Sequence, residues 1–167
     1  MNSGRPPYPH IHQISVSGGG VPKKPVLEAR VTLQGVEGDR QRNLKVHGGP
    51  DRAVCLYSLD VIEQLQQAGH SIKPGFSGEN LTLAGVDWEL VQPGVRLTVG
   101  PDVELEVMSY TSPCSHNGRW FHDGDYQRIS QEKHPGWSRV YAKVLKGGIV
   151  RPGDKVAVQA TVSRSTE

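Results

Sequence analysis

The chain has 167 residues, the usual size of a single domain, so a second independent hydrophobic core is not expected. Hydrophobic residues make up 35% of the sequence, while 20 glycines and 12 prolines favour many short strands joined by tight turns and exclude a bundle of long helices. The formal net charge of +2, with basic residues spread widely, excludes strong binding of nucleic acid through the field of the whole molecule.

The first segment of the chain has no apolar run. Residues 1–9 contain three prolines and one arginine. This composition predicts neither a secretory signal nor a membrane-spanning helix. We therefore expect a flexible N-terminus over residues 1–9, no membrane partner, and a cytoplasmic protein.

Apolar residues at alternate positions predict a series of short strands. The pair at 96–99 and 103–108 is expected to form a hairpin across Gly100-Pro101-Asp102. Along the whole chain the strands are expected at residues 11–16, 26–33, 53–57, 79–83, 96–99, 103–108, 139–145 and 154–158.

Two helices are expected between these strands. Ser58 can cap the first, and Gly69 can end it. The second is expected to start near Asp123 or Asp125 and to stop at His134-Pro135-Gly136.

The expected fold class is mostly β with two or three helices. A closed or half-closed β-barrel is the economical way to protect the edges of so many short strands. Residues 10–158 are expected to form this single domain, and residues 159–167, which lack apolar periodicity, a flexible tail.

The two cysteines are far apart and have no CxxC spacing, which argues against a disulfide framework or a structural zinc site. Cys55 lies between apolar residues of a predicted strand and is expected to fill the core. Cys114 follows a strand among polar, turn-forming residues, so its thiol is expected to be exposed. Cationic neighbours such as His116 or Arg119 would make it a nucleophile or a metal ligand, whereas without them it is an inert loop cysteine.

A basic segment over residues 38–52 is the second candidate site. Arginine binds phosphate or carboxylate through two N–H groups, and Gly48-Gly49 lets backbone N–H groups approach an anion. No Walker or GxGxxG spacing is present, so ordinary nucleotide folds are not indicated. The alternative interpretation is a solvated charged loop. The basic residues of this segment are Arg40, Arg42, Lys45, His47 and Arg52.

A third, shorter stretch at residues 76–81 contains Asn80, whose amide could lie beside a ligand. Taken together, these stretches resemble the MOSC domain family, which is named for its occurrence at the C-terminus of molybdenum cofactor sulfurases. The likeness extends from about Ile14 to Val158. Its motifs here are Gly38-Asp39-Arg40, the run from His47 to Val54, Gly78-Glu79-Asn80-Leu81, and Ser112-Pro113-Cys114.

The resemblance implies a MOSC-type β-barrel with a pocket for a molybdenum-pterin cofactor. In such a pocket Cys114 would be the metal ligand or the carrier of a persulfide, and a soft thiolate suits a sulfur-rich molybdenum centre. The residues that the resemblance assigns to the cofactor's phosphate and polar groups are Arg40, His47 and Arg52, with Asn80 and Ser112 as further candidates.

Three functions follow as hypotheses. The first is an oxidoreductase that reduces an N-hydroxylated small molecule with electrons from a separate electron donor protein. The second is a sulfur carrier that receives a persulfide on Cys114, for instance from a cysteine desulfurase, and delivers it for cofactor or metal-sulfur assembly. The third is a module that binds a small anion without chemistry. The sequence leaves the oligomeric state open.

Overall fold

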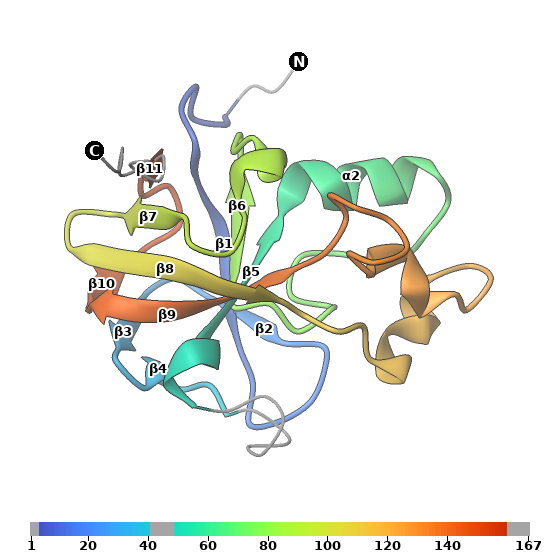
Figure 1. Ribbon diagram of the computed structural model, residues 1–167, viewed down its shortest axis with the longest axis horizontal. Helices are drawn as coiled ribbons and strands as arrows, with labels where there is room; N and C mark the ends of the chain where they lie inside the picture. The colour runs from blue at the N-terminus through green and yellow to red at the C-terminus, as the bar shows by residue number, and fades with distance from the viewer. Residues whose placement is uncertain (1–3, 41–48, 160–167) are drawn as a thin grey trace, which may run out of the picture.

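The computed structural model describes residues 4–40 and 49–159, which fold around an eight-stranded mixed sheet (Figure 1). The strand order is β11-β7-β8-β9-β5-β6-β1-β2, and only β5 and β6 run parallel within the described sheet. The strands are β1 (His10–Val16), β2 (Lys24–Val26), β5 (Val54–Ser58), β6 (Leu81–Ala84), β7 (Arg96–Val99), β8 (Val103–Tyr110), β9 (Val140–Lys146) and β11 (Val156–Gln159).

A second, three-stranded sheet has the order β10-β3-β4. It consists of β3 (Ala29–Thr32), β4 (Gly35–Val36) and β10 (Gly148–Val150). The single strand expected at 26–33 is therefore divided between two sheets. Its first part pairs with β1, and its second part pairs with β10, about 120 residues further along the chain.

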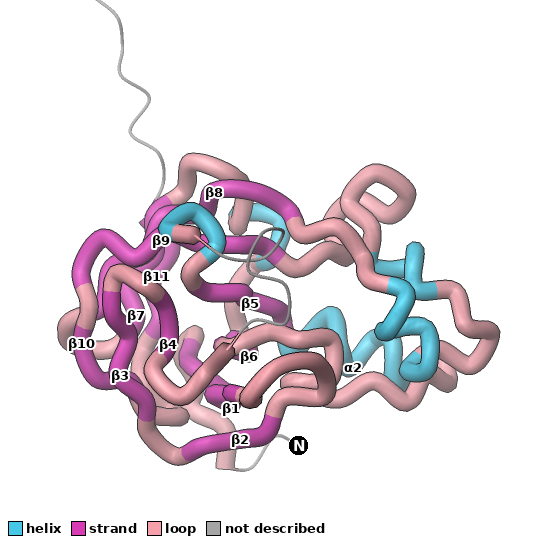
Figure 2. The backbone as a smooth tube through the Cα atoms, turned by 90° about the horizontal axis from the view of Figure 1, so that it is seen from below, coloured by secondary structure: helices cyan, strands magenta, loops and turns pink. Residues whose placement is uncertain are grey.

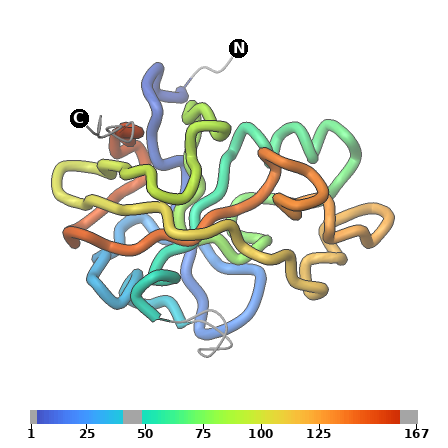
Figure 3. Tube along the Cα trace, viewed as in Figure 1, coloured from blue at the N-terminus to red at the C-terminus, as the bar shows by residue number. Residues whose placement is uncertain are grey.

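The large sheet curls until its beginning and end make contact. Val156 N–H donates to the carbonyl of Pro9 (2.9 Å), and Ile11 N–H donates to the carbonyl of Asp154 (2.9 Å). In consequence, the first and last described segments lie on the same side of the molecule (Figure 3).

The closed barrel allowed by the sequence is not formed within the described residues. Strand β1 pairs with β6 along one edge, and its last three residues pair with β2 along the other edge. Only the first residues of β1 are therefore free to meet the segment that leads into β11. That contact is a single bridge between His10 and Lys155. The curled mixed sheet thus stays open along most of its outer edges.

The predicted first helix is confirmed as α2 (Leu59–Gln67). The Ser58 side chain accepts a hydrogen bond from Val61 N–H (3.2 Å), which satisfies one of the open donors of the first turn. The buried side of the helix consists of Leu59, Val61, Ile62 and Leu65. None of the described helices has the length and apolar character needed to cross a membrane.

Replacing Ser58 with alanine should lower the free energy of unfolding by about 1 kcal/mol, because the cap is lost at a buried position. Urea denaturation of the variant measures this loss. Gln67→Ala, at an exposed position of the same helix, is the control and should stay within about 0.5 kcal/mol of the parent. Equal stability of the two variants would contradict the capping role.

The predicted second helix is shorter than expected. Only η4 (Tyr126–Ile129), a 3₁₀ helix capped by Asp125, forms there, and Ser130 returns the chain to an extended conformation. Together with η3 (Ser115–Trp120) it lies near α2, at the end of the molecule away from the small sheet (Figure 2). Two further 3₁₀ helices are η1 (Pro50–Arg52) and η2 (Trp88–Leu90).

Buried aromatic side chains fix the approach to β9. The hydroxyl of Tyr57 donates to the carbonyl of Trp137 (2.6 Å), and the indole N–H of Trp88 donates to the carbonyl of Ser138 (2.8 Å). The next carbonyl, that of Arg139, accepts from Thr111 N–H (3.1 Å) just beyond β8. The segment before β9 is therefore held on both sides, which sets the position of Arg139.

Candidate functional site

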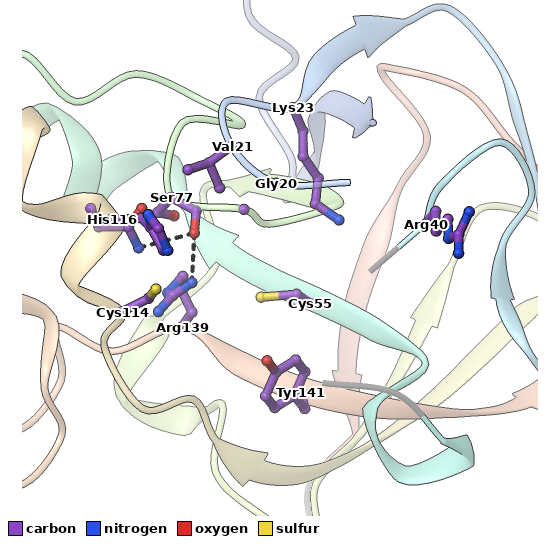
Figure 4. Close-up of a pocket in the computed structure, with 12 residues that line it drawn as sticks. Gly20, Val21, Lys23, Arg40, Cys55, Ser77, Cys114, His116, Arg139 and Tyr141 are labelled. Atoms are coloured by element: carbon purple, nitrogen blue, oxygen red, sulfur yellow. Dashed lines mark hydrogen bonds between the residues drawn. The ribbon is translucent and has the colours of Figure 1, made fainter. Parts of the chain in front are cut away.

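A pocket with a cavity volume of about 100 Å³ opens beside strands β5 and β9 (Figure 4). Its lining comes from segments that are far apart in the sequence, including the turn after β1, the loop before β6 and the loop after β8. The basic, thiol and phenol side chains in its lining are Lys23, Arg40, Cys55, Cys114, His116, Arg139 and Tyr141.

The pairing of β5 with β9 explains why three of these side chains share the pocket. Cys55 lies opposite Tyr141 in the antiparallel ladder. Arg139 precedes Tyr141 by two residues, and alternate residues of an extended chain project from the same face. The ladder therefore directs Cys55, Arg139 and Tyr141 to one side of the sheet.

Cys114 enters the pocket from the loop after β8. It is half-buried, in agreement with the exposure expected from its polar surroundings. Its carbonyl accepts a hydrogen bond from Asn117 N–H (2.9 Å), which fixes the turn into η3. Its side chain borders the same pocket as His116, one of the two neighbours expected to make the thiol reactive, and as Arg40. Arg119, the other expected neighbour, is not part of this lining.

Cys55 is buried as expected, with 4% of its surface exposed, but its side chain also borders the pocket. Burial raises the pKa of its thiol to about 11, so the group is protonated and neutral at physiological pH. The expectation that Cys55 only fills the core is therefore incomplete. In Figure 4 the two sulfur-bearing side chains lie on either side of Arg139 in the view.

Arg139 is the strongest feature that sequence reasoning did not single out as a site residue. Its side chain is 6% exposed. One terminal nitrogen donates to the carbonyl of Ser77 (2.6 Å), and the other donates to the carbonyl of Ser112 (3.3 Å). The Nε atom is buried and has no hydrogen-bond partner in the described structure. The sequence signals for it were an arginine at the start of the apolar run 139–145 and its place in the stretch 134–142, which resembles small stand-alone MOSC proteins.

A buried ion pair forms another wall of the pocket. Lys23 Nζ lies 2.7 Å from Asp39 Oδ2 and 2.9 Å from Oδ1, and the two side chains are 8% and 6% exposed. Asp39 also accepts from Ser17 N–H (2.9 Å), and Arg40 N–H donates to the carbonyl of Ser17 (2.8 Å). These contacts hold Arg40 at the pocket.

Asn80, a predicted cofactor contact, is fully buried and lies behind the pocket wall. Its Nδ2 donates to Asp39 Oδ2 (3.0 Å) and to the carbonyl of Ser15 (3.2 Å), while its Oδ1 accepts from Cys55 N–H (3.0 Å). The amide therefore connects the Asp39 carboxylate to the strand that carries Cys55. In this arrangement it positions pocket residues and does not itself border the cavity.

The remaining predicted residues are distributed around the site. Arg52 is exposed, and its guanidinium lies 5.7 Å from the centre of the Tyr141 ring. Ser112 is also exposed and contributes its carbonyl to Arg139. His47 lies outside the described residues.

The loop before β6 is fixed by a buried carboxylate. Glu79 is fully buried and accepts hydrogen bonds from Gly75 N–H (2.9 Å), Ser77 Oγ (2.7 Å) and Thr82 Oγ1 (2.9 Å). Gly75 is required here, because its φ is +84° and a Cβ atom would lie 2.8 Å from the carbonyl oxygen of Lys23. This loop presents the Ser77 carbonyl to Arg139.

The two cysteines should differ strongly in reactivity. At pH 8 a thiol with a pKa near 11 is ionised in roughly one molecule in a thousand, so Cys55 should be alkylated far more slowly than the accessible Cys114. Iodoacetamide labelling followed by peptide mass spectrometry measures both rates. Labelling of Cys55 should speed up as the pH rises toward 11, and equal labelling of both residues at pH 8 in the folded protein would refute the difference.

Comparison with known proteins gives a consistent result. A family model described as the MOSC domain matches residues 43–157. The chain is 31% identical over 136 residues to the uncharacterized protein YflK of Bacillus subtilis, covering 80% of this chain and 60% of that protein. It is 33% identical over 128 residues to the protein YiiM of Escherichia coli, covering 73% of this chain and 55% of that protein.

The fold is also similar to that of a solved structure. The crystal structure of a hypothetical protein superposes with a TM-score of 0.69 at 26% identity, covering 91% of this chain and 69% of that chain. The matched segments cover 60% of YflK and 55% of YiiM, so the chain spans little more than half the length of these two curated relatives. The segment matched by the family model includes Cys55, Cys114 and Arg139, and it begins after Lys23 and Arg40.

Proposed function

The chain belongs to the MOSC domain family, and from this premise we propose that it is a molybdenum-cofactor-dependent oxidoreductase that reduces small N-hydroxylated molecules. One observation carries the proposal: the accessible thiol of Cys114 borders the same pocket as Arg40 and Arg139. A thiol alone would fit many roles, whereas a thiol among cations fits an anionic centre that needs a soft ligand.

The residues present fit the molybdenum-pterin cofactor. A thiolate is a suitable ligand for a soft, sulfur-rich metal centre, and Arg40, which borders the same pocket, brings a positive charge to the negatively charged parts of the cofactor. The cavity volume of about 100 Å³ is enough for the metal end with its small ligands. The rest of such a cofactor would have to lie outside this enclosed part.

Each residue has a role in this proposal. Cys114 would bind the metal, and Arg40 would bind the phosphate or other polar groups together with His47 and Arg52. Asn80 and Ser112 would act through the backbone and side-chain contacts that hold the pocket wall. When bound, the cofactor supplies the two-electron chemistry.

The chain itself would control charge and protons around that centre. Burial raises the pKa of the Tyr141 hydroxyl to about 12, so at neutral pH the hydroxyl keeps its proton. Cys55 is likewise neutral. These two groups add no negative charge to the pocket, so the cations remain available to an anionic ligand. Electrons would come from a separate electron donor protein, and the two free thiols fit a reducing, cytoplasmic compartment.

Metal analysis tests the proposal. The protein purified from a host that makes the cofactor should contain molybdenum and pterin in amounts that rise together with its reductase activity. A preparation free of molybdenum that retains full activity on the N-hydroxylated substrate would overturn the proposal.

A second candidate function is sulfur carriage on Cys114. It is favoured by the same half-buried thiol, because neighbouring cations also stabilise a persulfide anion. Incubation with a cysteine desulfurase and cysteine should then add about 32 Da, one sulfur atom, to the peptide that contains Cys114. An unmodified Cys114 after that incubation would exclude the carrier function.

A further inference from the structure

Arg139 carries a buried positive charge that has no carboxylate partner in the described residues. No carboxylate oxygen there lies within 4.0 Å of its guanidinium. Its hydrogen bonds go to the carbonyls of Ser77 and Ser112, which are neutral, and its Nε has none. With 6% of its surface exposed, the side chain also receives little stabilisation from bulk water.

The nearby carboxylates are committed elsewhere. Glu79 accepts hydrogen bonds from Gly75 and Ser77 of its loop and from Thr82 of β6. It is linked to Arg139 through Ser77, whose hydroxyl donates to Glu79 and whose carbonyl accepts from Arg139. Asp39 is paired with Lys23. The segment 41–48, outside the described residues, contains no aspartate or glutamate, so it cannot supply a carboxylate side chain. Within the described residues, the positive charge of Arg139 therefore has no carboxylate in direct contact with it.

The groups that border the pocket beside Arg139 are compatible with an anion. Cys55 and Tyr141 keep their protons at neutral pH and do not repel negative charge. A buried guanidinium without a counter-ion lowers the stability of a protein, and such costs are typical of binding sites, where a ligand provides the missing charge. A guanidinium also matches oxyanions through its planar arrangement of N–H donors.

We propose that Arg139 forms an anion subsite in this pocket, which binds an oxyanion group of the small-molecule substrate. The substrates are accordingly small anionic molecules whose negative group pairs with Arg139 while the reacting end lies at Cys114. The assignment of the anion to the substrate rests on the proposed function. The existence of the subsite depends only on the surroundings of Arg139.

Sulfate is a suitable probe, because it presents the same oxyanion chemistry without a reacting group. Calorimetric titration of the cofactor-free protein with sodium sulfate, at an ionic strength held constant with sodium chloride, should show binding by the wild type. The midpoint of thermal unfolding should rise with sulfate and not with chloride alone. Arg139→Met, which keeps much of the side-chain volume, should weaken sulfate binding by roughly tenfold or more.

The matched control is Arg119→Met. Arg119 is exposed and lies over the ring of Trp120 at 4.8 Å, outside the lining of the pocket. This variant should bind sulfate as the wild type does. Sulfate binding by a folded Arg139→Met variant that is as strong as that of the wild type would overturn the proposal. If this variant does not fold, the wild-type titration still tests the proposal, because absence of sulfate binding to the wild-type protein also overturns it.

A second arm identifies the source of the anion. Protein loaded with cofactor should still bind sulfate if the subsite serves the substrate. Sulfate binding that is present in the cofactor-free protein and lost on loading would assign the subsite to the cofactor and overturn the substrate assignment. Failure of the protein to acquire molybdenum would overturn the proposed function and leave the cofactor-free titration unaffected, so the two failures are distinguishable.

Discussion

Replacing Cys114 with serine should lower the rate of reduction of an N-hydroxylated substrate by more than about 100-fold. Removing a residue that only hydrogen-bonds to a metal ligand typically costs about 10- to 100-fold in activity, and the loss of the ligand itself should cost more. A serine hydroxyl is a hard donor and a poor substitute for a thiolate at a soft metal. The folded structure should be retained, with the free energy of unfolding changed by about 0.5 kcal/mol or less, because Cys114 lies in a partly exposed loop. Steady-state kinetics with a chemical electron donor, together with metal content, measure the effect.

The neighbouring Ser115→Ala variant is the matched control. Ser115 is exposed and does not border the pocket, so its replacement should leave both rate and molybdenum content at wild-type values. Wild-type turnover by Cys114→Ser would remove Cys114 from the reaction. Loss of activity in Cys114→Ser accompanied by no molybdenum in the active wild type would instead favour sulfur carriage.

Replacing Asp39 with alanine should lower the free energy of unfolding by about 3 to 5 kcal/mol, because the variant leaves the Lys23 ammonium buried without a counter-charge. The loss also removes the acceptor of the Ser17 N–H and of the Asn80 amide. Urea denaturation monitored by tryptophan fluorescence gives the value. We expect this to be among the most destabilising single changes at the pocket.

Two controls separate the buried charge from other effects. Glu37→Ala breaks an exposed pair with Arg30, in which the side chains are 56% and 59% exposed, and should cost about 0.5 kcal/mol or less. The double variant Lys23→Met/Asp39→Leu removes both charges and should recover much of the stability lost in Asp39→Ala. An Asp39→Ala variant within about 1 kcal/mol of the parent would show that Lys23 finds compensation elsewhere.

The parts of the fold that the sequence predicts well are those fixed by local contacts. The hairpin of β7 and β8 and the start of α2 at Ser58 follow from turn residues and a capping side chain within a few positions. The small sheet was missed because β3 pairs with β10, and no local pattern reports a pairing across about 120 residues. The helix expected after Asp125 shortened to η4, since Ser130 leaves the helical conformation.

The same distinction holds for the pocket. Polar turn residues around Cys114 correctly indicated an accessible thiol, and the structure brings it to one pocket with Arg40. Cys55 and Arg139 stand in apolar strand sequences that look like core. Whether such a side chain meets a cavity depends on which loops cover that face of the sheet, and this is decided by tertiary packing alone. Asn80 is the opposite case. Its motif predicted contact with a ligand, whereas in the structure its amide joins Asp39 to the backbone of Cys55.

The most direct test of the account is X-ray absorption at the molybdenum edge, measured on wild-type protein and on Cys114→Ser from the same cofactor-producing host. If the sulfur of Cys114 binds the metal, the variant should show one sulfur neighbour fewer or retain no molybdenum at all. Identical sulfur coordination in the two proteins, or a wild type without molybdenum, would contradict the central claim.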